Sequence, residues 1–193
     1  MSEQVTADKI DYVKPDKALI ELAVDALAVA ERTGLRVITA ESCTGGLIAE
    51  VLSEAPGAAE YFEGAFVCYT KDNKCTALGI EPSLIERYSA VSAEVAKAMA
   101  EGALDRSSAS IAIAVTGVAG PDRDEANNPV GLVYFACSKH GVKTVCIERH
   151  FGDQGRSRIR YLAATEALTL LAQAASGNWD FAGSPGYVAS VGS

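Results

Sequence analysis

Hydrophobic residues follow two patterns along the chain, one with helical spacing and one of short continuous apolar runs. Apolar positions three or four residues apart, as at Ile20, Val24 and Leu27, predict helices that pack one face on a core. Short β-branched runs such as residues 109–115 predict buried strands. The predicted helices cover residues 16–34, 44–54, 71–78, 81–88, 92–106 and 157–175, and the predicted strands cover 36–40, 61–69, 109–115, 131–138 and 142–150.

The order of these elements indicates one fold class. Helices alternate with strands in the first half, and the turn Lys139-His140-Gly141 between the last two strands predicts a late hairpin. We therefore expect a single three-layer α/β/α domain with a mixed sheet, over residues 16–176. Residues 1–15 are expected to form an N-terminal arm. Residues 177–193, which contain Gly, Ser and Pro, are expected to form a loose tail.

Composition narrows the class of protein. The 193 residues are enough for one packed core. The formal net charge of -8 argues against a general nucleic-acid binder and against binding to anionic membranes, although a local basic pocket stays open. No apolar run reaches the roughly 20 residues that a membrane span needs. The early acidic residues and the lack of an apolar leader argue against secretion.

The cysteines and histidines indicate a reduced protein without a metal site. Five cysteines, an odd number, lie mostly in apolar runs, which predicts reduced core residues in a cytoplasmic protein. No Cys-x-x-Cys pair occurs, and the two histidines are His140 and His150. A zinc site is therefore poorly supported. We expect neither a metal nor another cofactor.

The turn over residues 41–46 connects a predicted strand to a predicted helix and carries a hydroxyl beside a thiol, at Ser42 and Cys43. Helix N-termini offer unpaired backbone N–H groups and a positive dipole end. Gly45 and Gly46 allow a ligand to approach the backbone closely. The turn can therefore hold a phosphate or a developing oxyanion. The alternative is a simple helix cap by Ser42 or Thr44.

Three loops with unusual residues leave predicted strand ends, over residues 41–46, 69–74 and 116–122. Ligands of open α/β sheets bind beyond the carboxyl ends of strands. These loops therefore define a candidate site if their strands are neighbours in the sheet, which the sequence does not prove.

Ser42 is a candidate nucleophile, and a serine hydroxyl needs a base at neutral pH. His140 is expected on the surface of a hairpin turn, whereas His150 ends a strand and stays open as a base. Lys74 is the other candidate base, provided that burial or a positive neighbour lowers its pKa. Tyr69 would then relay the proton or orient the hydroxyl. The alternatives are a solvated Lys74 on an exposed helix and a Tyr69 ring in a core or interface.

Cys43 is the rival nucleophile, because a thiol at a helix N-terminus can have a lowered pKa. Neighbouring residues of a strand point to opposite faces, so only one of Ser42 and Cys43 is expected to face the pocket.

Two further regions are candidates for substrate binding. The loop that contains Thr116, Gly117 and Gly120 would bring backbone N–H groups to a phosphate or sugar, or it is a plain turn. Three arginines begin the last helix, and Arg156 is a candidate anion clamp if it points inward. A surface stripe of charge is the alternative for Arg158.

Taken together, the motifs resemble those of the CinA C-terminal domain family over about residues 17–172. The resemblance rests on Glu41-Ser42-Cys43-Thr44-Gly45-Gly46, Phe66-Val67-Cys68-Tyr69 with Lys74, Thr116-Gly117-Val118-Ala119-Gly120-Pro121-Asp122, and Pro129-Val130-Gly131. Stand-alone members of this family are nicotinamide-nucleotide amidases, which convert nicotinamide mononucleotide to nicotinate mononucleotide and ammonia. The resemblance implies an α/β fold, no metal, a small-molecule nucleotide substrate and a homo-oligomer.

The resemblance also implies roles for individual residues. The catalytic serine falls on Ser42, and its tyrosine and lysine fall on Tyr69 and Lys74. We expect the substrate to contact residues from the two glycine-containing loops and the last helix. This expected set is Cys43, Thr44, Gly45, Gly46, Thr116, Gly117, Gly120 and Arg156.

One segment departs from the family pattern, and two other functions remain open. The segment before the last helix, residues 151–156, has one residue more than the family's pattern, which affects the assignment of Arg156. A non-catalytic nucleotide-binding or regulatory module would keep the glycine loops but need no tuned lysine. A hydrolase of another small amide would differ in substrate range.

Overall fold

The computed structural model describes residues 15–181 and 183–188. No helix within these ranges is both long and apolar enough to cross a membrane. The strands are β1 (Val37–Glu41), β2 (Phe62–Val67), β3 (Ile111–Gly117), β4 (Leu132–Lys139) and β5 (Val142–His150). The helices are α1 (Lys17–Thr33), α2 (Leu47–Glu54), α3 (Ala58–Tyr61), α4 (Lys71–Leu78), α5 (Pro82–Tyr88), α6 (Ala93–Asp105) and α7 (Arg156–Ala175).

The five strands form one mixed sheet in the order β2-β1-β3-β4-β5. Strand β1 is parallel to both β2 and β3, whereas β4 and β5 form an antiparallel hairpin beside β3. The carboxyl ends of β1, β2 and β3 therefore meet at one edge of the sheet. This arrangement brings together the loops over residues 41–46, 69–74 and 116–122, as the candidate site requires.

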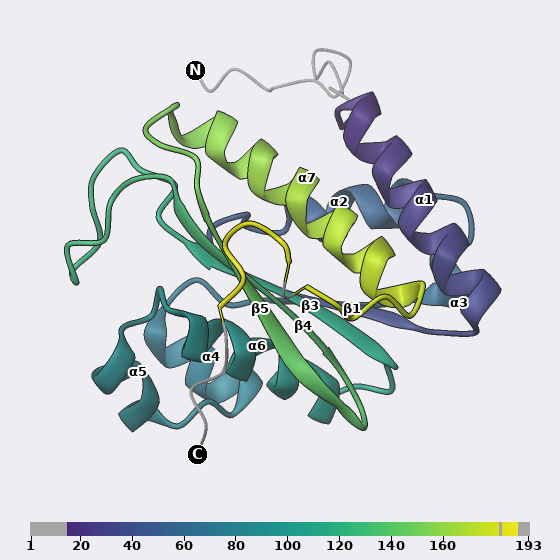
Figure 1. The fold of residues 1–193 in the computed structure, drawn as a ribbon, viewed down its shortest axis with the longest axis horizontal. Helices are drawn as coiled ribbons and strands as arrows, with labels where there is room; N and C mark the ends of the chain where they lie inside the picture. The colour runs from purple at the N-terminus through teal and green to yellow at the C-terminus, as the bar shows by residue number, and fades with distance from the viewer. Residues whose placement is uncertain (1–14, 182, 189–193) are drawn as a thin grey trace, which may run out of the picture.

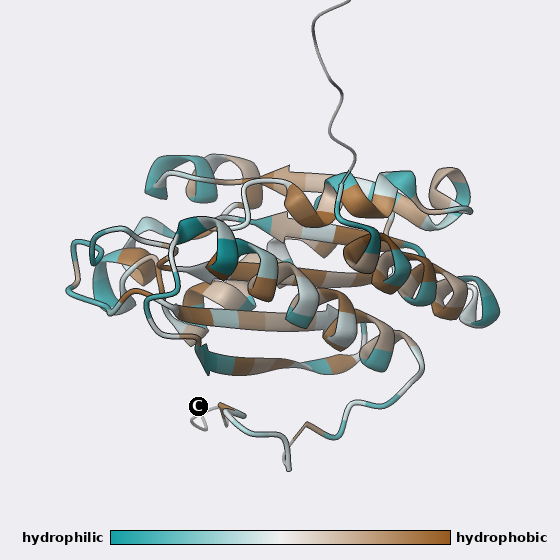
Figure 2. Cartoon of the chain, turned by 90° about the horizontal axis from the view of Figure 1, so that it is seen from above, coloured by the Kyte–Doolittle hydropathy of each residue, from teal (hydrophilic) through white to brown (hydrophobic). Residues whose placement is uncertain are grey.

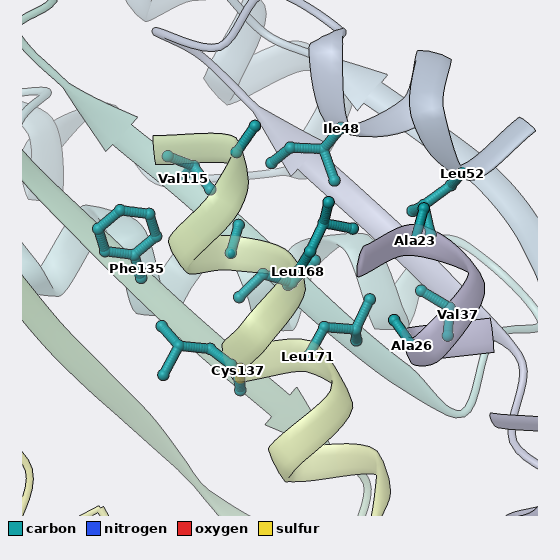
Figure 3. Close-up of a cluster of buried hydrophobic side chains, with 14 of the residues drawn as sticks. Ala23, Ala26, Val37, Ile48, Leu52, Val115, Phe135, Cys137, Leu168 and Leu171 are labelled. Carbon is teal, nitrogen blue, oxygen red and sulfur yellow. The ribbon is translucent and has the colours of Figure 1, made fainter. Parts of the chain in front are cut away.

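Helices cover both faces of the sheet, so the predicted three-layer α/β/α domain with a mixed sheet is confirmed (Figure 1). Helices α1, α2 and α7 lie over one face, and α4, α5 and α6 lie over the other. Alternate strand residues face the two layers. Val37 and Val115 belong to the cluster with α1, α2 and α7 (Figure 3). Ile38 and Ala112 belong to the cluster with α6. Apolar strand residues lie between helices whose outer faces are mostly hydrophilic (Figure 2).

Capping residues fix the ends of two helices close to the predicted boundaries. The Asp16 carboxylate accepts the amides of Ala18 and Leu19 at the start of α1, and Gly34, with φ of 65°, ends that helix. Ser92 caps α6 in the same way. The helix predicted from residue 44 begins only at Leu47, because the preceding glycines adopt positive φ angles.

The segment after α7 is not loose as predicted, within the part that the structure describes. Phe181 is buried in the core under α7. The Gly186 carbonyl accepts the Glu148 amide at 2.8 Å, and the Val188 amide donates to the Cys146 carbonyl at 3.0 Å. The segment thus covers the outer edge of β5, where unpaired backbone groups need partners (Figure 1). Residues 189–193, and most of the predicted N-terminal arm, lie outside the described residues.

Candidate active site

Ser42 and Lys74 form a buried hydrogen-bonded pair beyond the end of β1. The Lys74 ammonium nitrogen Nζ lies 2.8 Å from Ser42 Oγ and 2.9 Å from the Cys68 carbonyl oxygen. Lys74 is only 2% exposed, so it is not the solvated helix charge that was the alternative. Burial lowers the pKa of Lys74, against the opposing influence of nearby cysteines. A lysine with a lowered pKa beside a hydroxyl can act as a general base.

Strand pairing explains how these two side chains meet. The Cys68 amide donates to the Glu41 carbonyl at 2.7 Å, which extends the β1–β2 pairing into the two loops. Thr70 then caps α4 by accepting the Asn73 amide, and Lys74 lies in the first turn of that helix. From there Lys74 reaches back to the Cys68 carbonyl and across to Ser42.

The Cys43 side chain packs on the opposite face of the sheet from the Ser42 hydroxyl, although Cys43 also contributes to the lining of the cavity beside Ser42. It is 5% exposed and belongs to the apolar cluster that α1, α2 and α7 form with the sheet. Burial raises the pKa of the Cys43 thiol to about 12, although the charge of Lys74 acts in the other direction. Because the thiolate is the nucleophile, this environment disfavours Cys43 as the attacking group.

Glu41 occupies the N-terminus of α2, where the sequence predicted a bound anion. Its buried carboxylate accepts the amides of Gly46, Ile48 and Ala49 at 3.0, 3.2 and 2.8 Å, and the Thr39 hydroxyl at 3.1 Å. The positive end of α2 is therefore compensated inside the protein. Sequence reasoning missed this role, because Glu41 lies five residues before the first amide that it accepts and so outside the usual capping position.

The backbone amides of the turn are accordingly divided between two uses. The Gly45 amide donates to the Ser42 carbonyl, and the Gly46 amide donates to Glu41. The amides of Cys43 and Thr44 instead interact with the Cys43 sulfur, where they oppose the larger effect of burial on the pKa of that thiol. The predicted contribution of Gly45 and Gly46 is conformational instead, because their φ angles of 62° and 92° are in the left-handed region.

Thr44 is held in place through its carbonyl group. The Arg160 side chain donates to this carbonyl from Nε at 3.0 Å and from Nη2 at 2.7 Å. The Thr44 side chain is fully buried, and its hydroxyl has no hydrogen-bond partner among the described residues. The expected contact between the Thr44 side chain and a substrate stays a prediction.

A cavity of about 640 Å³ opens beside the Ser42–Lys74 pair. This volume is typical of a site for a small organic molecule. One part of its wall is apolar, from residues 89–91 and 118–120, and its rim is charged. The charged residues of the rim are Lys71, Asp72, Asp122, Arg123, Asp124, Glu125 and Arg156.

Arg156 and Tyr69 meet at this cavity. Arg156 donates from Nη1 to the Gly120 carbonyl at 2.6 Å and from Nη2 to the Tyr69 hydroxyl at 2.8 Å. Tyr69 is 61% exposed, and among the described residues its hydroxyl forms no hydrogen bond with Ser42 or Lys74. The structure thus places Tyr69 with the anion-clamp candidate, and the proton-relay role stays a prediction.

Close backbone packing brings Arg156 to the cavity despite the irregular segment before α7. A Cβ atom on Gly131 would lie 2.3 Å from the Gly152 carbonyl oxygen, so only glycine fits there. The Phe151 amide also donates to the Gly131 carbonyl at 2.9 Å. These contacts hold residues 151–155 against the start of β4 and aim the first residue of α7 inward.

Thr116 and Gly117 line the cavity and also shape it. The Thr116 hydroxyl donates to the Ala90 carbonyl at 2.8 Å, which fixes the apolar wall over residues 89–91 to the end of β3. A Cβ atom on Gly117 would lie 2.7 Å from the Leu132 carbonyl oxygen, so β4 packing requires glycine at this position. Gly120 orients Arg156 through its carbonyl. Direct substrate contacts of the three residues remain predictions.

Neither histidine belongs to this site. His140 is exposed in the β4–β5 hairpin, and His150 pairs with the Glu148 carboxylate on β5. The cavity lining includes neither of them, so a Ser-His-Asp arrangement does not form around Ser42. Within the described residues, no group of three His, Cys, Asp or Glu side chains could hold a metal ion.

Comparison with known proteins agrees with the fold and the motifs. A 47% identical relative, a CinA-like protein of Acidobacterium capsulatum, matches over 141 residues, which are 73% of this chain and 34% of that protein. A CinA-like protein of Mycobacterium tuberculosis is 44% identical over 156 residues, 80% of this chain and 36% of the relative. This chain therefore spans about a third of the length of these curated relatives.

Solved structures share the whole architecture. The competence/damage inducible protein CihA from Agrobacterium tumefaciens is 41% identical, with a TM-score of 0.77 over 83% of this chain and 97% of that one. A competence-damaged protein (CinA) superfamily protein from Escherichia coli is 32% identical, with a TM-score of 0.78 over 90% and 99% of the two chains. The family model of the CinA C-terminal domain matches residues 19–175. The chain thus belongs to the CinA C-terminal domain family.

Proposed function

We propose that this protein is an amidohydrolase that converts nicotinamide mononucleotide to nicotinate mononucleotide and ammonia. The observation that carries the proposal is the buried Lys74 Nζ, 2.8 Å from Ser42 Oγ and beside a cavity of small-molecule size. A serine with a desolvated lysine base is a combination suited to acyl transfer without a metal. The choice of substrate rests on the family resemblance of the motifs.

In the first step, neutral Lys74 accepts the Ser42 proton while Oγ attacks the carboxamide carbon. The Cys68 carbonyl orients the lysine nitrogen by accepting one of its N–H bonds. Backbone N–H groups around the turn over residues 43–46 stabilise the negative charge that develops on the carboxamide oxygen. Loss of one such donor typically costs about 3 kcal/mol of transition-state stabilisation.

In the second step, protonated Lys74 donates its proton to the departing nitrogen, the carbon–nitrogen bond breaks, and ammonia leaves. Ser42 then carries the nicotinoyl group of the nucleotide as an ester. A water molecule attacks this ester while Lys74 accepts one of its protons. The ester bond then breaks as Lys74 returns this proton to Ser42 Oγ, and the carboxylic acid product loses its remaining proton to solvent, which restores the free enzyme.

Arg156 is the proposed binding partner of the substrate's phosphate group. The guanidinium group lines the cavity and contacts only neutral oxygens, those of Gly120 and Tyr69, among the described residues. Helix α7 begins at this residue without a side-chain cap, so its first amides and its positive dipole end add to the attraction for a phosphate.

Ammonia release tests the proposal directly. Purified wild-type protein is incubated with nicotinamide mononucleotide and EDTA, beside Ser42→Ala and Cys43→Ala. We expect release by the wild type and by Cys43→Ala, and none by Ser42→Ala with an unchanged circular dichroism spectrum.

Other outcomes identify the alternatives. Activity in Ser42→Ala but not in Cys43→Ala would move the nucleophile to the thiol. Calorimetric binding of the nucleotide without ammonia release would favour a nucleotide-binding module. Neither binding nor release would favour another small amide as substrate.

A further inference from the structure

Two arginines of α7 reach different parts of the site from one side of the helix. Arg156 and Arg160 are four residues apart, so their side chains leave α7 one turn apart on the same face. Arg156 contacts the cavity mouth through Gly120 and Tyr69, and Arg160 contacts the turn that carries Ser42. Arg158, which lies between them in sequence, instead stacks over the Tyr161 ring on the outside of the helix, with its guanidinium carbon 5.2 Å from the ring centre.

The Arg160 contact fixes a segment that has little rigidity of its own. Two nitrogens of the guanidinium group bind one carbonyl oxygen, that of Thr44, two residues after Ser42. The same group lies close to Gly45, since a Cβ atom there would be 3.4 Å from Arg160 Nη2. Glycine loses more backbone freedom on ordering than other residues do, so Gly45 and Gly46 need such external contacts to hold one conformation.

In the proposed mechanism, negative charge develops on the substrate's carboxamide oxygen beside the turn that contains Thr44. The Thr44 amide lies in the turn over residues 43–46, whose backbone N–H groups hold the oxyanion in the proposed mechanism. A shift of this segment would therefore displace an oxyanion donor together with the Ser42 hydroxyl. A displacement of about 1 Å can reduce turnover about 100-fold.

We propose that Arg160 is a positioning residue that couples anion binding at Arg156 to the alignment of Ser42. The inference rests on the proposed function, and it adds that the substrate's phosphate accelerates the reaction as well as anchoring the substrate. An anion that draws Arg156 and the start of α7 into the cavity presses Arg160 onto the Thr44 carbonyl. Binding energy from a remote part of a substrate can in this way raise kcat and not only lower KM.

A substrate cut into two pieces tests the coupling. Nicotinamide riboside has the reacting amide but no phosphate, and inorganic phosphate supplies the missing anion separately. For the wild type we expect slow hydrolysis of the riboside that increases about tenfold with saturating inorganic phosphate. An unchanged or reduced rate on addition of phosphate would contradict the coupling.

Arginine variants separate positioning from binding. In Arg160→Gln we expect kcat for the mononucleotide to fall about 100-fold with little change in KM, and phosphate activation to disappear. Arg160→Lys should recover part of kcat, because one donor to the Thr44 carbonyl remains. Arg156→Gln should instead raise KM and also abolish activation. Arg158→Gln is the matched control, with kinetics like the wild type.

Amide hydrogen exchange keeps this test independent of activity. Inorganic phosphate should slow exchange in residues 43–46 of the wild type, and it should not do so in Arg160→Gln. If Arg160→Gln lowers only the unfolding temperature and keeps kcat and the phosphate response, Arg160 has a structural role alone. If the wild type hydrolyses no nucleotide yet shows the protection, the proposed function fails and the coupling stands.

Discussion

Ser42 and Cys43 are neighbours in the chain, yet the fold gives them opposite surroundings. Ser42 turns to the α4 and α6 face, where it meets Lys74 and the cavity. Cys43 belongs to the buried apolar cluster on the α2 and α7 face. Figure 3 shows Ile48 and Leu168 of this cluster. The intrinsically weaker nucleophile therefore has the base. In the proposed mechanism, the face of the sheet to which each side chain turns therefore decides which of the two residues reacts.

The same physical cause acts on both sides of the turn with different results. Burial disfavours the charged form of any titratable group. It lowers the pKa of Lys74 and so makes this lysine a better base at neutral pH. It raises the pKa of Cys43 to about 12 and so keeps this thiol protonated. Three substitutions or titrations test this contrast, in order of decreasing effect on activity.

Replacement of Lys74 should have the largest effect. We expect Lys74→Met to lose a factor of about 1000 or more in kcat, because general base catalysis disappears while the volume of the side chain is kept. The free energy of unfolding should stay the same or rise, since a buried amine without a carboxylate partner is removed. Ammonia release and urea unfolding measure the two quantities. Lys17→Met, on the exposed side of α1, is the control.

The titration of Lys74 should appear both in activity and in stability. We expect kcat/KM to rise with pH through a folded-state pKa below the ordinary 10.5, as Lys74 loses its proton. Between the lowered pKa of Lys74 in the folded protein and its ordinary pKa in the unfolded chain, only the unfolded chain keeps Lys74 protonated. The free energy of unfolding therefore rises with pH in this range. That stability is lost as the pH falls through the folded pKa. A Lys74→Met variant with the same pH dependence of unfolding would contradict this assignment.

Replacement of Cys43 should affect activity least. We expect Cys43→Ala to retain kcat within about threefold and to lower the free energy of unfolding by about 1 kcal/mol, because a buried side chain is shortened. The wild-type thiol should resist iodoacetamide at pH 8 in the folded protein and react after unfolding in urea. Rapid alkylation of Cys43 in the folded state, with loss of activity, would reverse the contrast.

Local sequence patterns predicted most of the helices and strands, and they predicted which loops form the candidate site. Asp16 and Gly34 cap the helix predicted over residues 16–34, and Ser92 caps the start of the helix predicted over residues 92–106. The loops at three strand ends were identified as a candidate site, and the order β2-β1-β3 brings them together. The segment over residues 177–188 was missed, because composition does not show that Phe181 has a place in the core.

The roles of Glu41 and Arg160 were beyond local patterns. Glu41 acts on amides of α2, and Arg160 reaches Thr44 from a helix more than a hundred residues later in the chain. No spacing in the sequence encodes such a contact. The sequence also did not determine whether Lys74 is buried. Helix α4 exposes most of its other residues and has no clear apolar face.

The sequence by itself determined the mixed α/β fold, the helix caps and the presence of a hydroxyl–thiol turn, because these depend on residue type and short-range periodicity. Only the tertiary structure decided which of Ser42 and Cys43 faces the cavity and whether Lys74 is solvated. Both depend on desolvation, which arises when distant elements pack on the two faces of the sheet. The physical difference between a reactive and an inert side chain is in this case a property of the packed layers.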